Sequence, residues 1–261
     1  MLQTAGLGYH EVTNDPFSTG IQGRPRSAQF TLTTAAFEEH LARVAGAAVQ
    51  PTLVTQTDLT RPGRHLFLTF DDGGKSAMHA AEALARRGWR GHFFIVTSAI
   101  GQRTFVGTAD MHELRDAGHV VGSHSHTHPY VFRDQTIERM VDEWRVSADI
   151  VAQILGQPCE AASVPGGHVS AAVLRSGAAA GLRYLFTTTP TLAPRNIGGC
   201  WILGRALIKA THPLHQIEAL VQFRGWTAAL ILRQLKDAAA RSMPGLFRAY
   251  ATQMTDPPGG A

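Results

Sequence analysis

Apolar positions along the chain follow two spacings, which alternate from residue 66 onward. Short continuous apolar runs, such as His65–Phe70 and His92–Val96, predict buried strands. Between these runs, apolar residues recur every three or four positions, which predicts helices. The predicted strands are 7–12, 65–70, 92–96, 120–122, 161–165, 183–188 and 201–209, and the predicted helices are 37–47, 76–87, 110–118, 137–155, 171–180, 214–223 and 227–240.

The pattern that predicts a helix most clearly covers residues 137–155. Its apolar residues lie at three- and four-residue steps from Ile137 to Leu155, and Gly156 ends the pattern. Asp110 and Glu113 have the capping-box spacing, which predicts that another helix opens at Asp110. Both helices are interpreted as core elements without chemistry of their own.

Strands alternating with helices, without an internal repeat or linker, are typical of a single α/β domain. A single βα barrel fits the order best, and a doubly wound open sheet is the alternative. In both folds ligands gather at the carboxyl ends of the strands, where the polar clusters of this sequence fall. We expect one domain over residues 1–242 and a C-terminal extension over 243–261, whose Pro- and Gly-rich end is expected to be disordered.

Composition narrows the class of protein. An apolar fraction of 44% with 17% charged residues is typical of a well-cored globule rather than a disordered chain. Neither a membrane-spanning run nor a secretory signal is visible, so a cytoplasmic location is expected. The two cysteines, Cys159 and Cys200, are interpreted as reduced thiols.

The formal net charge of +4 comes from scattered arginines, with lysine only at 75, 209 and 236. Nucleic-acid binding is not expected, because no basic run or aromatic-interleaved stripe occurs. The charge allows contact with an anionic glycan or the inner membrane surface without choosing between them. The sequence does not fix the oligomeric state.

Two polar clusters follow predicted strands. Asp71 and Asp72 come directly after strand 65–70, and two adjacent buried carboxylates need a cation or a proton to compensate them. The Gly73-Gly74 turn is expected to re-aim both side chains into one pocket. A surface Asp-Asp-Gly turn is the alternative.

The second cluster is Ser123-His124-Ser125-His126-Thr127-His128-Pro129. Pro129 disfavours helical geometry at His128, so the segment is expected to be a loop. Three histidines within five positions, together with the aspartates, indicate a metal site. One alternative set of ligands uses His126 in place of Asp72.

These two segments carry a resemblance to a known family. Thr69-Phe70-Asp71-Asp72-Gly73 is similar to the first signature of the polysaccharide deacetylases (NodB-homology domain, carbohydrate esterase family four), and His124-Ser125-His126-Thr127-His128 is similar to the second. The resemblance is strong over residues 66–129 and weaker to residue 209. The N-terminal GYHEV stretch also resembles the first barrel strand of many members.

The resemblance implies a distorted (β/α)7 barrel of NodB-homology type. It makes Asp71 the general base, and it makes Asp72, His124 and His128 the ligands of one divalent metal ion. Zinc is the expected ion, with cobalt and nickel as alternatives. A carboxylate and two imidazoles leave open positions for water and an acetyl carbonyl. The family has a variable residue at the position of His126, which disfavours the three-histidine set.

The later signatures depart from the family pattern. In the third, Pro165 and Gly167 match, but Ser163 stands where an arginine is expected, and Gly166 replaces an aromatic residue. The N–H of Gly166 could still stabilise an oxyanion. The Asp-Trp signature has no match, and the final histidine signature is missing.

Several residues are candidates to replace the missing groups. His212 is a weak candidate for the general acid and is equally interpreted as a cap before Pro213; His215 and His168 are weaker. Arg205 either replaces the missing arginine in space or is a solvated residue at a strand end.

The sequence therefore predicts a metal-dependent hydrolase that removes N-acetyl groups from amino sugars in surface polysaccharide or lipopolysaccharide O-antigen biosynthesis. Its partner would be an N-acetylated sugar or glycan precursor. The alternatives are a catalytically impaired metal-containing glycan-binding module and an O-acetyl esterase on the same scaffold.

Overall fold

The computed structural model describes residues 1–15, 19–20, 27–129, 131–167 and 169–242. The expected C-terminal extension 243–261 and the weak candidate His168 lie outside these residues. Within the described part of the chain, no helix is long and apolar enough to cross a membrane.

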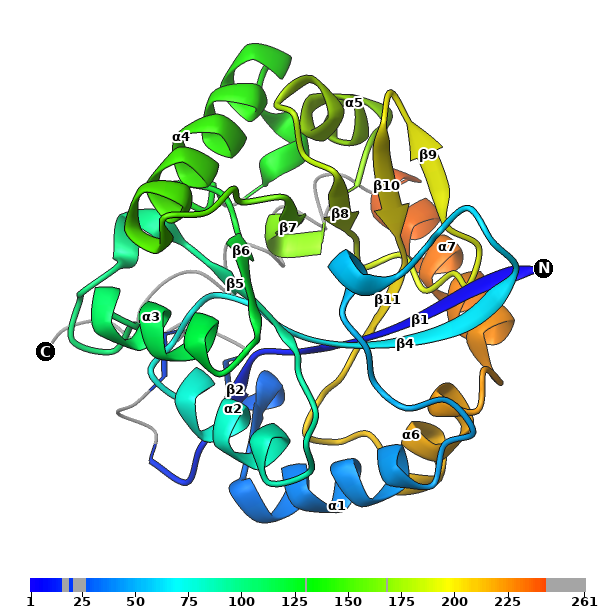
Figure 1. The fold of residues 1–261 in the computed structure, drawn as a ribbon. Helices are drawn as coiled ribbons and strands as arrows, with labels where there is room; N and C mark the ends of the chain where they lie inside the picture. The colour runs from blue at the N-terminus through cyan, green and yellow to red at the C-terminus, as the bar shows by residue number, and fades with distance from the viewer. Residues whose placement is uncertain (16–18, 21–26, 130, 168, 243–261) are drawn as a thin grey trace, which may run out of the picture.

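A curled, mostly parallel sheet forms the centre of the fold, as Figure 1 shows. Its strand order is β11-β1-β4-β5-β6-β7-β8-β10-β9, and only the β10–β9 pair is antiparallel. The main strands are β1 (Leu2–Tyr9), β4 (Gly63–Phe70), β5 (His92–Ile95), β6 (Val120–Ser123), β7 (Ala161–Ser163), β8 (Tyr184–Phe186), β9 (Arg195–Ile197), β10 (Cys200–Leu203) and β11 (Arg205–Leu207). A separate parallel pair joins β2 (Glu11–Val12) and β3 (Thr31–Leu32).

One bent segment closes the barrel. The single strand predicted over 201–209 is wrong in this respect, because Gly204 divides it into β10, which pairs with β8, and β11, which pairs with β1. A Cβ on Gly204 would lie 2.4 Å from the carbonyl oxygen of Thr191, so only glycine fits at this bend. Counted as one position, the bent segment joins β1, β4, β5, β6, β7 and β8 in a distorted (β/α)7 barrel. The predicted fold class is confirmed.

Helices surround the barrel, with α1 and α6 side by side and α4 packed beside α5 (Figure 1). Their bounds are α1 (Thr34–Ala45), α2 (Ala77–Ala85), α3 (Thr108–Asp116), α4 (Ile137–Leu155), α5 (Ala171–Ala179), α6 (Leu214–Val221) and α7 (Trp226–Ser242). Helix α4 has the predicted bounds: the Thr136 hydroxyl caps its start, and Gly156 ends it in the left-handed region with φ 67°. Helix α3 begins two residues before the predicted Asp110, because the Asp110 carboxylate accepts the N–H of Gly107 at 2.6 Å.

The parallel arrangement places all the carboxyl ends of the strands at one end of the barrel. Asp71 and Asp72 follow β4, His124 follows β6, and Ser163 ends β7. The segment 51–62 precedes β4, so it lies at the opposite end, where Val54 and Leu59 are buried with the Phe67 and Phe186 side chains. The polar clusters predicted from the sequence therefore meet at one end.

Candidate metal centre and active site

Asp72, His124 and His128 lie together at the carboxyl ends of β4 and β6. The Asp72 Oδ1 atom is 3.4 Å from His124 Nε2 and 3.6 Å from His128 Nε2. One ligand atom from each of the three residues lies within 4.8 Å of the others, a spacing that allows all three to hold one ion. The side chains are 5%, 2% and 12% exposed, respectively, so this cluster is shielded from bulk water.

The backbone at this cluster is strained. Four non-glycine residues in the described part of the chain have positive φ, and three of them belong here: Asp72 (73°), Ser125 (65°) and His128 (52°). Such conformations cost about 1–3 kcal/mol each and concentrate at functional sites. The expected re-aiming of the carboxylates occurs at Asp72 and Gly73, not at Gly74. Gly74 instead makes room for Glu11, whose Oε1 atom would lie 2.5 Å from an added Cβ.

Ser163 fixes the orientation of the His124 ring. The His124 Nδ1 atom is 2.6 Å from Ser163 Oγ and 3.0 Å from the Ser163 carbonyl oxygen. Since Ser163 Oγ donates its own hydrogen to Asp71, it accepts from Nδ1. A neutral His124 ring therefore carries its hydrogen on Nδ1 and leaves the Nε2 lone pair free for an ion.

Asp71 has a different environment from its neighbour. Arg205 grips the carboxylate through two parallel bonds, Nη1 to Oδ1 and Nη2 to Oδ2, each 2.8 Å long. Ser163 Oγ adds a third bond at 2.9 Å. Arg205 is fully buried, and it also donates to Thr69 Oγ1 at 2.8 Å and to the Thr187 carbonyl oxygen at 3.2 Å. The interpretation of Arg205 as a solvated residue is wrong.

Glycine makes the space for this arginine. A Cβ at Gly6 on the neighbouring β1 would lie 2.7 Å from Arg205 Cγ. The guanidinium also lies 5.9 Å from the ring centres of Phe94 and Phe186, which supply a cation–π environment inside the barrel. The arginine missing from position 163 is thus replaced in space from β11.

Electrostatics keep both aspartates ionised. Burial raises the pKa of Asp71, but the charge and hydrogen bonds of Arg205 outweigh it and lower the pKa to about 2. Burial likewise opposes ionisation of Asp72, yet the hydrogen bond from His124 and the nearby His10 and His128 bring its pKa well below its ordinary value. A cation bound between the Asp72 oxygen and the two histidine nitrogens would favour the ionised carboxylate further.

Glu143 on α4 holds the histidine loop in place. Its buried carboxylate accepts the N–H groups of His126 (2.9 Å) and Thr127 (2.7 Å), and also the Thr127 hydroxyl. The His126 ring is directed elsewhere, with Nδ1 3.0 Å from Thr97 Oγ1. His126 does not belong to the cluster found among the described residues, so the geometry does not favour the three-histidine set.

His10 is a site residue that the sequence analysis missed. It directly follows Tyr9, whose carbonyl oxygen accepts the N–H of Asp71 at 3.0 Å. Burial lowers the pKa of His10, while the charges of Asp72 and Asp71 oppose this shift. Its Nδ1 atom is buried without a hydrogen-bond partner among the described residues. The signal available in the sequence was its position after the first barrel strand.

The other candidates take different places. His212 Nδ1 accepts the N–H of Lys209 at 2.7 Å. The interpretation of His212 as a helix cap is wrong, because the N-cap of α6 is Pro213, without a side-chain hydrogen bond. His215 is exposed on α6. Gly166 is exposed just after β7, with φ 61°.

The donor set can hold one divalent cation. One carboxylate oxygen and two imidazole nitrogens occupy three positions of a tetrahedral site and leave a fourth for water, as in catalytic zinc sites. Cobalt and nickel accept the same nitrogen and oxygen donors. Beside this site lies Asp71, an ionised carboxylate that Arg205 orients.

Comparisons with known proteins bear on the family and the fold. Residues 58–185 match the polysaccharide deacetylase family model. A search of curated proteins found no match to the sequence.

Solved structures of similar fold include a polysaccharide deacetylase from Bacillus cereus, with a TM-score of 0.68, 20% identity, and coverage of 84% of this chain and 69% of that one. The deacetylase PplD from Streptococcus pyogenes in complex with acetate has a TM-score of 0.68 at 17% identity, over 83% of this chain and 96% of that one. IcaB from Ammonifex degensii has a TM-score of 0.67 at 18% identity, over 85% and 98%. At these identities the likeness shows the fold. Residues 58–185 carry the sequence pattern of the polysaccharide deacetylase family, and the chain has the fold of these deacetylases.

Proposed function

We propose that this protein is a metal-dependent hydrolase that removes N-acetyl groups from amino sugars during assembly of a surface polysaccharide, such as a lipopolysaccharide O-antigen. One observation carries the proposal: an ionised, arginine-held Asp71 lies directly beside a three-residue metal cluster. Water activation for amide hydrolysis needs this combination of a base and a cation site.

In this proposal Asp72, His124 and His128 hold one divalent ion, with zinc as the expected metal. When bound, the ion acidifies a water molecule and polarises the acetyl carbonyl. Asp71 accepts the proton of that water. Its low pKa keeps the base ionised at neutral pH, and the acidified water compensates for the weak basicity.

Two further groups complete the proposed mechanism. His10 follows the end of β1 near Asp71, and we assign it the transfer to the leaving nitrogen of the proton that Asp71 takes from the water, the role that no later signature fills. The N–H of Gly166 is proposed to stabilise the oxyanion, since that contribution needs no side chain.

Arg205 bears on the alternative of an impaired binding module. That alternative rests on the missing arginine of the third signature, and a buried arginine now contacts the same aspartate from another strand. Turnover is therefore the function that the geometry supports best.

Acetate release tests the proposal. The purified protein is incubated with N-acetylated amino sugars in nucleotide-linked, lipid-linked and oligomeric forms, and with O-acetylated sugars as a matched ester set. We expect release from an N-acetylated substrate, its loss on chelation, and its return with added zinc. Metal and glycan binding without release across the panel would contradict the proposal in favour of a binding module, and release from the esters alone would identify an esterase.

A further inference from the structure

A cavity of about 420 Å³ opens at the end of the barrel opposite the metal cluster. It lies between the segment 55–60, which precedes β4, and the first residues of β8 and β10. Since β4, β8 and β10 belong to one parallel set, these residues are at the end where strands begin, whereas the metal cluster is where strands finish. The volume falls within the range of about 300–1,000 Å³ for small-molecule sites.

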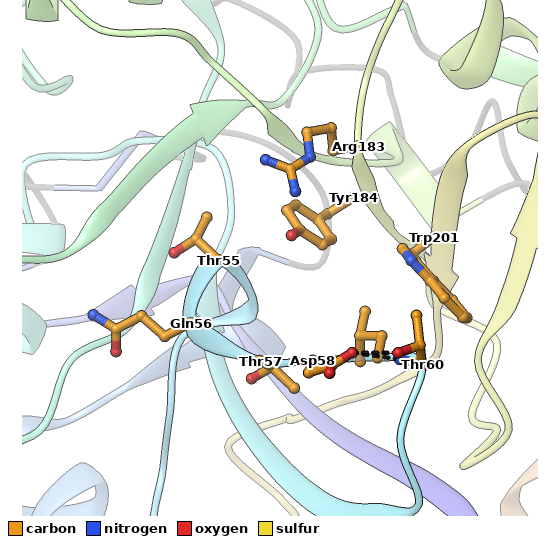
Figure 2. Close-up of a pocket in the computed structure, with 9 residues that line it drawn as sticks. Thr55, Gln56, Thr57, Asp58, Thr60, Arg183, Tyr184 and Trp201 are labelled. Atoms are coloured by element: carbon orange, nitrogen blue, oxygen red, sulfur yellow. Dashed lines mark hydrogen bonds between the residues drawn. The ribbon is translucent and has the colours of Figure 1, made fainter.

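Tyr184 and Trp201 line one side of the cavity, where Trp201 is half-buried and Tyr184 is only 5% exposed, so the accessible aromatic surface there is that of Trp201. Tyr184 and Trp201 are directly paired residues of β8 and β10, so their side chains are neighbours on the sheet. Arg183 extends this side, with its guanidinium 5.3 Å from the Tyr184 ring centre and bonded to Glu160 at 2.5 Å. Figure 2 shows Tyr184 and Trp201 together with the threonines of segment 55–60 that also line the cavity.

The segment 55–60 contributes hydroxyl, amide and carboxylate groups, of which those of Thr57, Asp58 and Thr60 are held by hydrogen bonds. The Thr57 hydroxyl donates to the Leu53 carbonyl oxygen at 2.8 Å, and the Thr60 hydroxyl donates to Asp58 at 2.6 Å. Both hydroxyl oxygens keep acceptor capacity. Thr55 and Gln56 are exposed beside them and supply a further hydroxyl and an amide.

We propose that this cavity is a second sugar-binding site, which takes a pyranose unit of a glycan against the Trp201 ring. Apolar C–H faces of a pyranose fit this ring, and its hydroxyl groups fit the polar groups of segment 55–60. A phosphate or nucleotide fits poorly, because Arg183 is already paired with Glu160 and Asp58 is anionic. An acyl chain fits poorly, because most of the lining side chains carry a polar group.

This inference rests on the proposed function only for the class of ligand. With the two sites at opposite ends of the barrel, the second site would hold a different part of a long glycan from the part being deacetylated. Such two-point attachment raises the affinity for a polymer without new contacts at the reacting sugar. The site would therefore favour oligomeric substrates over single sugars.

The test measures binding at the cavity separately from catalysis. The full chain, kept metal-free with chelator, is titrated with a tetramer of N-acetylglucosamine, and the Trp201 indole N–H signal is followed by NMR after assignment with a Trp201→Phe variant. We expect this signal to shift saturably. Thr55→Arg, an exposed change that fills the cavity, is expected to weaken binding at least about tenfold, as lost burial of one ring face implies.

Trp89→Ala serves as the matched control, because Trp89 is also partly buried but lies away from the cavity. It is expected to leave the titration unchanged. No shift of the Trp201 signal, or a shift that persists in full in Thr55→Arg, would overturn the inference. Because no acetate is measured, an inactive enzyme with a saturable Trp201 signal refutes the proposed function alone.

Discussion

The two adjacent aspartates of the site have opposite surroundings. Asp72 faces two histidines from one loop, whereas Asp71 faces Arg205 and Ser163 from two other strands. We call Asp72, His124 and His128 the metal-ligand group; its residues come from two short segments of the sequence. We call Asp71, Arg205 and Ser163 the base group; its residues come from strands on different sides of the barrel.

The proposed ligands and the proposed base depend on different parts of the chain. The proposed ligands lie in two short segments, one of which is the strained histidine loop. The proposed base requires a cationic side chain beside its carboxylate, and more than one strand of the barrel can carry such a side chain. Here β11 supplies it through Arg205, with Gly6 making room. Loss of the arginine at position 163 therefore need not mean loss of the base.

The largest expected effect separates the two groups by function. Asp71→Asn and His10→Gln should each lower acetate release by about 10²–10⁴-fold, the usual contribution of a general acid or base. Both variants should still retain the metal, because neither residue belongs to the ligand cluster. Metal analysis and acetate release on the same preparations check this. Undiminished release would remove the changed residue from the mechanism.

Removing the arginine tests the base group as a structural unit. Arg205→Met leaves the buried Asp71 carboxylate unpaired, so the free energy of unfolding should fall by about 3–5 kcal/mol. Denaturant unfolding of the metal-free proteins measures this loss. Arg86→Met, which breaks exposed ion pairs with Glu38 and Glu82, should cost less than about 1 kcal/mol.

A double variant sharpens this prediction. Adding Asp71→Leu to Arg205→Met removes the unpaired charge and should restore part of the lost stability. Equal losses in Arg205→Met and Arg86→Met would mean that Arg205 does not hold the base.

Acid unfolding gives a smaller effect of known sign. The pKa of Asp71 is lowered from an ordinary value of 3.8 to about 2 in the folded protein. A lowered folded-state pKa contributes stability that is complete above the unfolded pKa and is lost as pH falls through the folded one. The metal-free protein should therefore lose roughly 2 kcal/mol from this group between about pH 4 and pH 2.

Asp71→Asn is the comparison that isolates this loss, because Asp72 and the other carboxylates titrate in both proteins. The stability difference between wild type and variant should shrink as pH falls over this interval. A difference that stays constant with pH would contradict the assignment of a lowered pKa to Asp71.

The smallest effect concerns Ser163, the residue that joins the two groups. Ser163→Ala removes the hydroxyl between Asp71 and His124 but keeps the carbonyl acceptor for His124 Nδ1. Loss of one such hydrogen bond, about 0.5–1.5 kcal/mol, corresponds to a roughly two- to twelvefold weaker zinc affinity. Competition with a zinc chelator measures it. Ser176→Ala, a buried serine bonded to Trp144, should leave the affinity unchanged; equal affinities in both variants would exclude a bridging role for Ser163.

Much of the fold could be predicted from the sequence, because local patterns determine it. The bounds of α4 follow from its apolar stripe and from Gly156, and the βα order predicts the barrel. The break at Gly204 could not be predicted, since its cause is the approach of the distant Thr189 and Thr191 carbonyl oxygens. Strand β9 was missed because its three residues are largely exposed and carry no apolar run.

The site shows the same division. Asp72, His124 and His128 stand in compact motifs, so the sequence could name them together. The partners of Asp71 are separated from it by 92 and 134 positions, for Ser163 and Arg205 respectively, and only the closed barrel brings them into contact. Glu143 was missed because the helix that carries it was interpreted as a core element. His10 was missed because it belongs to no motif with chemistry.

The central claim is that one divalent ion is bound by Asp72, His124 and His128. Metal analysis of the wild type and single variants after equilibration with zinc tests it most directly. We predict about one ion per chain in the wild type, Asp71→Asn and His126→Ala, and loss of the ion in Asp72→Ala, His124→Ala and His128→Ala. Full retention of zinc in these last three variants would contradict the account.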